Sequence, residues 1–397
     1  MDPGRLLAWV REHRDDYVAL VARLAALESP TDVPASQAPV QAVLAEALEE
    51  LGFRVRHHPG AATGGFLLAR PAARRRGRPL QLLVGHTDTV WPVGTLEVMP
   101  VREEDGRLAG PGTFDMKAGV AQMVFALRAL RAVEAEPPAT PVLLLNSDEE
   151  TGSPESGRAV RRLARRVCRA FVPEPSWGPE GALKTARKGV GTFTVHIHGR
   201  PAHAGLNPGG GASAIVELAS VIRRLHALTD LAVGTTVNVG VVEGGTRTNV
   251  VAARARAEVD VRVVTMDEGR RVEELILGLQ AETPGVTLHV EGGMRIPPLE
   301  RTPGNRRLWA QARAAAAALG QELSETMVGG ASDGSVISQH APTLDGMGAI
   351  GDGAHAPHEH VLVEPTVDRI ALLALLLLAP VDGPAAERAQ HPGPGGP

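Results

Sequence analysis

The spacing of apolar residues changes part-way along the chain, and this change constrains the fold more than any other feature. In the first half, continuous apolar runs alternate with helical patterns and lie at 79–83, 141–145 and 170–172. Such runs are typical of strands that are buried on both faces of a mostly parallel sheet. The sequence therefore predicts an α/β layer, and the same pattern returns from residue 306 to a final helix beginning at Thr366.

The block between these parts alternates apolar and polar positions, as half-buried strands do. Phe193, Val195 and Ile197 alternate with polar neighbours, and the elements that follow have the order β-α-β-β-α-β. That order is the ferredoxin-like motif, so we expect a small domain inserted into the α/β domain. We predict the larger domain at 1–187 and 297–380 and the inserted domain at 188–296. A Pro/Gly-rich disordered tail is predicted at 381–397.

Composition limits the sites and partners that we expect. Cys168 is the only cysteine, which excludes internal disulfides and thiolate clusters and leaves His, Asp and Glu to hold any metal. The net charge of -4 and an aromatic content of 3% argue against nucleic-acid binding. No apolar run reaches the ~20 residues of a membrane span, and residues 1–16 lack a signal-peptide pattern. We therefore expect a cytoplasmic protein without a membrane partner.

Five short stretches rich in His, Asp and Glu stand out, at 85–89, 112–119, 147–152, 173–175 and 353–357. Four of them lie just after predicted strands, and open α/β sheets bind ligands beyond the carboxyl ends of their strands. Convergence would place two imidazoles and at least three carboxylates together, and like charges raise one another's pKa steeply. Divalent cations remove that repulsion, so the pattern indicates a metal site.

These stretches resemble the motifs of the M20 metallopeptidases, which include glutamate carboxypeptidase, aminoacylase and succinyl-diaminopimelate desuccinylase. The shared motifs are His-Thr-Asp-Thr-Val, Gly-Pro-Gly-Thr-x-Asp-x-Lys-x-Gly, Asp-Glu-Glu-x-Gly and Gly-Ala-His. The resemblance covers about 24–378. It implies a zinc-exopeptidase-type α/β/α catalytic domain in which the inserted ferredoxin-like domain is a lid and a dimerisation domain.

The resemblance also implies two divalent metal ions, with Zn²⁺ as the first choice and Co²⁺ or Mn²⁺ as alternatives. His86 and Glu174 resemble the ligands of one ion. Glu150 and His355 resemble those of the other, and Asp115 resembles the carboxylate that bridges both ions.

Three further features follow from the same resemblance. Asp88 corresponds to the acid that orients His86, a role that also makes physical sense. The bond Asp115–Met116 is expected to be a cis peptide. Glu149 is expected to take a proton from the attacking water and to deliver it to the leaving amine.

The inserted domain carries four residues that the resemblance, or their chemistry, assigns to the substrate. His203 resembles the histidine that crosses a dimer interface and stabilises the oxyanion, and Asn249 resembles a substrate-contacting asparagine. Arg295 lies where glutamate carboxypeptidase-like members hold the substrate carboxylate, which a guanidinium binds in a bidentate manner. Arg262 is a second candidate for that role.

Together these features predict a di-metal hydrolase that cuts an amide bond next to a free carboxylate and releases a C-terminal amino acid such as glutamate. An N-acyl amino-acid amidohydrolase of the aminoacylase or desuccinylase type is the alternative. The expected partners are a small peptide or N-acyl amino-acid substrate and a second copy of the chain, bound through the lid.

Two interpretations from other classes remain open. The segment 330–334 matches G-x-S-x-G, the pattern around the nucleophile of serine esterases, which would make Ser332 the nucleophile. That assignment leaves most of the acidic stretches without a role. The chain could also be a metal-loaded module that binds peptides without cutting them, but the acid at position 149 argues against this.

Overall fold

The computed structural model describes residues 2–73 and 77–381. The chain divides into a larger unit (Met1–Thr185, Arg301–Met327 and Ser332–Pro397) and a smaller unit (Ala186–Glu300 and Val328–Ala331). The predicted larger domain includes 328–331, whereas in the structure this segment packs with the smaller unit. The predicted disordered tail at 381–397 lies outside the described residues except for Val381.

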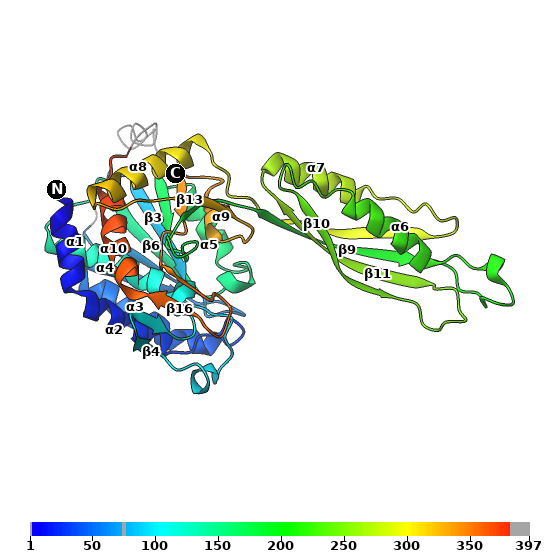
Figure 1. Cartoon of the computed structure of the whole chain (residues 1–397), viewed down its shortest axis with the longest axis horizontal. Coiled ribbons are helices and arrows are strands. Elements are labelled where there is room, and N and C mark those ends of the chain that lie inside the picture. The colour runs from blue at the N-terminus through cyan, green and yellow to red at the C-terminus, as the bar shows by residue number, and fades with distance from the viewer. Residues whose placement is uncertain (1, 74–76, 382–397) are drawn as a thin grey trace, which may run out of the picture. The chain divides into compact units, whose positions relative to one another are not determined.

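An eight-stranded sheet forms the centre of the larger unit, in the order β1-β2-β6-β3-β7-β14-β8-β13 (Figure 1). The strands are β1 (Phe53–His58), β2 (Phe66–Pro71), β3 (Leu80–His86), β6 (Thr140–Asn146), β7 (Arg169–Val172), β8 (Leu183–Arg187), β13 (Glu325–Val328) and β14 (Thr343–Asp345). The four central strands β6, β3, β7 and β14 run parallel, and β1, β2 and β8 are antiparallel to their neighbours. The sheet predicted to be mostly parallel is thus a mixed sheet with four parallel strands at its centre.

Helices cover both faces of this sheet because alternate residues of its central strands point to opposite sides. Leu83 is buried on the face covered by α4 (Ala118–Ala132) and α10 (Val363–Leu378). Leu82 and Val84 are buried on the other face, against α5 (Gly157–Ala164) and α9 (Asp333–Ile337). The first face also carries α1 (Pro3–Glu12), α2 (Arg14–Ala25), α3 (Gln37–Glu50) and α8 (Pro303–Ala318). The α/β/α fold predicted for the catalytic domain is therefore confirmed.

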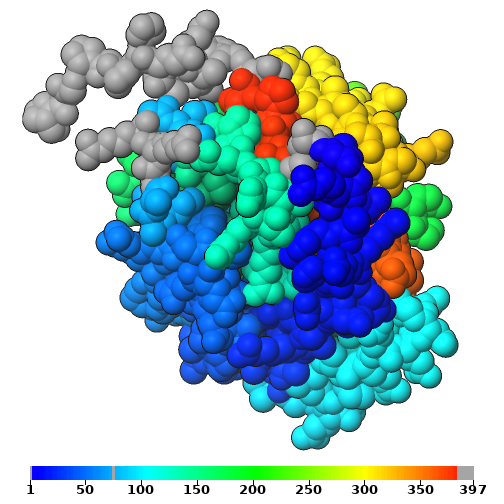
Figure 2. Space-filling model, turned by 90° about the vertical axis from the view of Figure 1, so that its left-hand side faces the viewer, coloured from blue at the N-terminus to red at the C-terminus, as the bar shows by residue number. Residues whose placement is uncertain are grey.

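The N-terminal helices and the last helix of the larger unit lie on one side. Figure 2 shows the N-terminal helices in dark blue close to α8 in yellow and the end of α10 in red. Arg11 of α1 forms a bidentate ion pair with Asp368 of α10, at 2.9 and 2.8 Å. Among the described residues, no helix is both long and apolar enough to cross a bilayer.

A smaller sheet of four strands lies beside the entry to α4, in the order β15-β16-β5-β4. Its strands are β4 (Arg102–Glu104), β5 (Arg107–Ala109), β15 (Gly351–Asp352) and β16 (His360–Leu362). The antiparallel pairing of β16 with β5 opposes His360 to Ala109. This pairing brings the segment around residue 355 to the segment around residue 115.

The smaller unit is a four-stranded antiparallel sheet in the order β10-β11-β9-β12, with two helices packed on one face (Figure 1). Its elements are β9 (Gly189–His198), α6 (Ala214–His226), β10 (Thr236–Gly244), β11 (Arg254–Val263), α7 (Met266–Leu277) and β12 (Thr287–Ile296). Phe193, Val195 and Ile197 are buried beneath these helices. The β-α-β-β-α-β order and this sheet confirm the predicted ferredoxin-like domain.

The smaller unit's stability depends on the buried face of β9. Ile197→Ala removes a side chain that is 0% exposed, so we expect a loss of about 2–5 kcal/mol in the free energy of unfolding of this unit. His198→Ala, at the next position on the exposed face, should change it by less than about 0.5 kcal/mol. Urea unfolding of the two variants measures both values, and equal losses would contradict this account of the core.

Candidate metal centre

Three neighbouring parallel strands deliver four of the predicted site residues to one edge of the sheet. His86 is the last residue of β3, and Glu174 lies two residues after β7. Glu149 and Glu150 form the 3-10 turn that follows β6. Because β6, β3 and β7 are adjacent and parallel, their carboxyl ends meet, as the strand-end argument predicted.

The remaining two predicted metal ligands, Asp115 and His355, lie in irregular backbone. Asp115 lies in the turn Thr113–Lys117 at the start of α4, and the bond Asp115–Met116 is cis, as expected. The preceding Gly112 has φ of 71°, and a Cβ there would lie 2.5 Å from the Thr89 methyl group, so this position requires glycine. His355 also has positive φ, 60°, in the loop between β15 and β16.

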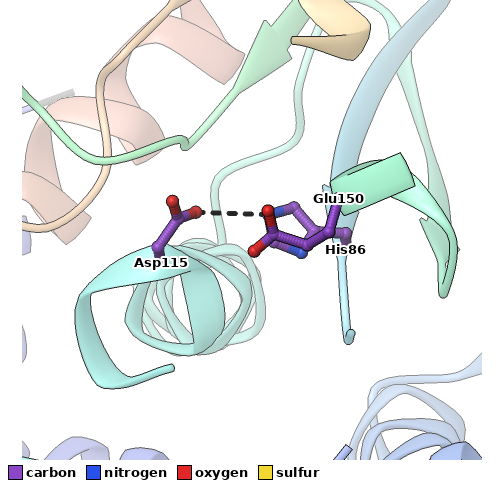
Figure 3. Close-up of side chains that lie close together, drawn as sticks. All are labelled: His86, Asp115 and Glu150. Atoms are coloured by element: carbon purple, nitrogen blue, oxygen red, sulfur yellow. Dashed lines mark hydrogen bonds and ion pairs between the residues drawn. The ribbon is translucent and has the colours of Figure 1, made fainter. Parts of the chain in front are cut away.

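The ligand atoms form two sets that share the Asp115 carboxylate. Nε2 of His86 lies 3.3 Å from Oδ1 of Asp115 and 3.5 Å from Oε1 of Glu174. Nε2 of His355 lies 3.5 Å from Oδ2 of Asp115 and 3.2 Å from Oε2 of Glu150. Figure 3 shows His86, Asp115 and Glu150 directed toward one another from a strand end, a helix entry and a turn. Each oxygen of Asp115 therefore lies near a different histidine, and each histidine lies near a different glutamate.

These distances fit metal coordination. Ligand atoms bound at ~2.0–2.2 Å around a tetrahedral zinc ion lie ~3.3–3.6 Å from one another, close to the spacing observed here. Nδ1 of His86 lies 2.9 Å from the Asp88 carbonyl oxygen, and donating its proton there leaves the Nε2 lone pair facing the carboxylates. Oε1 of Glu150 is buried and has no hydrogen-bond partner among the described residues. The donor set thus suits two divalent cations.

The electrostatics of the site favour positive charge. The pKa of His355 is raised to about 10 by its hydrogen bonds to Asp115 and Glu150. Burial lowers the pKa of His86, but the carboxylates of Asp115, Asp88 and Glu174 prevail and hold it well above its usual range. Protons on these imidazoles balance the acidic groups, and bound cations would take over that role.

Glu149 differs from the residues around it. Its side chain is half-buried and, within the described residues, makes no hydrogen bond or ion pair. Burial and the neighbouring charge of Glu174 raise the pKa of Glu149 well above its ordinary value. A carboxylate that is not committed to another group, and that binds a proton readily, is suited to general acid–base chemistry.

Asp88 contacts more than His86. Its Oδ1 lies 3.4 Å from Nδ1 of His86, while Oδ2 accepts hydrogen bonds from the Thr31 hydroxyl at 2.8 Å and the Glu150 amide at 3.2 Å. The Glu149 amide donates to Oδ1 at 3.4 Å. Asp88 therefore fixes the turn that carries the two glutamates as well as the imidazole.

His203 and Asn249 lie together beyond the end of β9. The Ala204 amide donates to the Asn249 carbonyl at 2.9 Å, and both named side chains are exposed. Nδ1 of His203 accepts from the amides of Gly205 and Leu206, at 3.2 and 3.1 Å, which leaves Nε2 for another partner.

Arg262 and Arg295 lie near the opposite end of β9. Nε of Arg295 donates to the Thr192 hydroxyl at 3.1 Å, and Arg262 forms an ion pair with Asp260 at 2.9 Å. From Thr192 to the end of β9 at His198 is about 20 Å at ~3.3 Å per residue. One smaller unit therefore cannot present all four predicted residues to one small substrate.

Ser332 is part of a helix cap. It is 3% exposed, its hydroxyl donates to the Asp345 carboxylate, and it accepts from the Gly334 amide at the start of α9. His355, which a serine mechanism would need, lies with Asp115 and Glu150 instead. The geometry gives the serine esterase interpretation no support.

Sequence reasoning missed Glu359. This acid is 1% exposed and accepts hydrogen bonds from the backbone amides of Phe114 and Asp115. The available signal was an acid between two histidines, shortly after the Gly-Ala-His motif.

Known proteins resemble this chain over most of its length. The model of peptidase family M20/M25/M40 matches residues 82–379. Carboxypeptidase G2 of Pseudomonas sp. is 27% identical over 340 residues, which cover 83% of this chain and 81% of that protein. Acetylornithine deacetylase of Myxococcus xanthus is 30% identical over 351 residues, covering 82% and 88%. A probable carboxypeptidase of Aspergillus clavatus is 34% identical over 271 residues, 62% of this chain and only 58% of that protein's length.

Solved structures show the same fold. The aminopeptidase PepT of Bacillus cereus superposes with a TM-score of 0.78 at 25% identity, covering 92% of this chain and 98% of that one. YxeP of Bacillus subtilis, described as a dinuclear metal-binding peptidase of the M20 family, has a TM-score of 0.64 at 17% identity, covering 93% and 99%.

Asp88 provides a test of how the centre is held together. In Asp88→Asn an amide group replaces an oxygen that accepts from backbone N–H groups, so we expect metal affinity to fall about 10- to 100-fold. Asp32→Asn, a change in a nearby exposed acid, is the control and should leave affinity unchanged. Zinc titration against a competing chelator measures both, and equal affinities would show that Asp88 does not support the site.

Proposed function

The chain belongs to peptidase family M20/M25/M40, and we propose that it is a two-metal hydrolase that cuts an amide bond next to a free carboxylate. The observation that carries the proposal is the placement of each Asp115 oxygen against a separate His–Glu pair. The chain spans little more than half the length of the Aspergillus relative, so the activity rests on the site as well as on the family.

In this proposal His86 and Glu174 hold one ion, Glu150 and His355 hold the other, and Asp115 lies between them. When bound, a pair of divalent ions supplies Lewis acidity that polarises the scissile carbonyl and lowers the pKa of a water molecule. Imidazole and carboxylate donors favour Zn²⁺, with Co²⁺ or Mn²⁺ as alternatives.

Glu149 acts as the general base and then as the general acid. It takes a proton from the attacking water and delivers it to the nitrogen of the leaving amine. Its raised pKa, caused by burial and by Glu174, supports this role because a good proton acceptor is also a good donor near neutral pH.

Arg295 is the better candidate to bind the substrate's carboxylate. Its guanidinium donates through Nε to the Thr192 hydroxyl, a neutral group that does not neutralise the positive charge of the arginine. Arg262 is held by the Asp260 carboxylate through both Nε and Nη2. We propose a C-terminal amino acid such as glutamate as the leaving group, which the likeness to carboxypeptidase G2 supports. An N-acyl amino acid is the alternative, in keeping with the acetylornithine deacetylase relative.

We also propose a homodimer formed through the smaller unit. β10 is an edge strand whose Val241 and Val242 are 45% and 52% exposed, and an apolar edge strand readily pairs with another chain. A dimer would account for the separation of His203 and Asn249 from Arg295, because these residues could then serve the sites of different subunits. His203 would stabilise the oxyanion in the partner subunit.

Metal removal and a single substitution test the reaction. We expect about two zinc ions per chain, loss of amide hydrolysis on chelation and recovery when zinc is restored. Glu149→Gln keeps the side-chain volume but cannot accept the proton, so kcat should fall by about 10²–10⁴-fold with metal content unchanged.

N-acyl glutamate and its C-terminal amide form a matched substrate pair for the same assay. The free acid should be hydrolysed and the amide should not. Activity that survives chelation but is lost to a serine-directed reagent would overturn the metal mechanism and return attention to Ser332.

The dimer is tested by placing a charge on the edge strand. Val242→Glu should shift the chain from dimer to monomer in light scattering and lower kcat, because a buried interface does not accept an unpaired carboxylate. Thr287→Glu, an exposed position on the opposite edge strand β12, is the control. A monomeric variant with full activity would remove His203 from the mechanism.

A further inference from the structure

Glu359 binds the turn that carries Asp115. Its Oε1 accepts from the amides of Phe114 at 2.9 Å and Asp115 at 3.0 Å. Its Oε2 accepts from the Gly112 amide at 2.9 Å and the indole N–H of Trp91 at 2.7 Å. Four donors thus converge on one buried carboxylate, which offers about four acceptor positions.

The turn needs this acceptor because its backbone is not helical. Asp115 has φ of -114° and ψ of 98°, and Met116 has φ of -130° and ψ of 34°. Amides at the start of a helix have no intrahelical partner, and buried amides must find one elsewhere. Hydrogen bonds to a charged acceptor are shorter and stronger than neutral ones, so Glu359 determines where Asp115 lies.

The same residue closes the loop that carries His355. The Glu359 amide donates to the Ala356 carbonyl at 2.9 Å, and the Glu359 carbonyl accepts from Gly110 at 3.3 Å. The following residue, His360, pairs with Ala109 in the small sheet. Glu359 therefore joins the Asp115 turn to the His355 loop, two segments that are distant in the sequence.

The two halves of the centre depend on this connection to different degrees. His86 is the last residue of β3 and pairs with Asn146 of β6 in the large sheet. Glu174 follows β7 by two residues, and its carbonyl accepts from the Gly348 amide at 2.9 Å. On the other side, the Asp115 amide donates to the Glu359 carboxylate, and the Glu359 amide closes the loop that carries His355 by donating to the Ala356 carbonyl.

We propose that Glu359 is a positioning residue that builds the Glu150–His355 half of the metal centre. The His86–Glu174 half depends on it only through the shared Asp115. This inference rests on the proposed two-metal function. It adds that metal binding at the Glu150–His355 half of the site depends on Glu359.

Glu359→Gln tests the inference on the full chain. The new amide keeps one oxygen acceptor but turns an NH₂ group toward donors at Gly112 and Trp91. Zinc binding to the metal-free chain is measured by calorimetry with a competing chelator. We expect one site to weaken about 10- to 100-fold and the other to change by only a few-fold.

Two further variants assign the weakened site and control for the substitution. His355→Ala removes a ligand of the Glu150–His355 site, so adding Glu359→Gln to it should weaken the remaining ion by only a few-fold. Glu364→Gln changes a side chain that is 69% exposed, and both sites should bind as in the wild type.

If thermal unfolding shows that Glu359→Gln does not fold, Trp91→Phe replaces it, since this change removes one donor and leaves three. It should weaken the same site, by a smaller factor. Unchanged affinity at both sites, or equal loss at both, would overturn the inference. A wild-type chain that binds fewer than two ions would instead contradict the proposed function itself.

Discussion

The Asp115 carboxylate, placed between two imidazole–carboxylate pairs, is the arrangement on which the rest of the site depends. Two histidines, His86 and His355, lie within 3.5 Å of this carboxylate. Each histidine also lies within 3.5 Å of a glutamate, Glu174 for the first and Glu150 for the second. This concentration of acidic groups is unfavourable unless positive charge compensates it. The pKa values of both histidines are raised because their protonated forms supply this positive charge.

The fold holds the ligand residues in place in two ways. Parallel strands place His86 and Glu174 at one edge of the sheet. Sheet pairing with Asn146 fixes His86, and a hydrogen bond from the Gly348 amide to its carbonyl supports Glu174. Irregular segments supply Asp115 and His355, and these need their own support. Glu359 supports the Asp115 turn by accepting hydrogen bonds from its backbone amides. Asp88 does the same for the turn that carries Glu149 and Glu150. The ligands are therefore held mainly through the backbone.

The sequence predicted the strand-end residues well because apolar runs locate strands, and parallel strands share an edge. It also predicted the smaller unit, since alternation and element order are local properties. It did not predict Glu359, because the amides that this acid binds are exposed by a non-helical turn far away in the sequence. Nor did it show that β9 separates His203 from Arg295, which depends on where each residue lies along a strand.

Anomalous diffraction measures directly where the ions bind. Crystals of the zinc-loaded chain would be measured on both sides of the zinc absorption edge. We predict two anomalous peaks flanking the Asp115 carboxylate, one between His86 and Glu174 and one between Glu150 and His355. A single peak, or peaks remote from Asp115, would contradict this prediction.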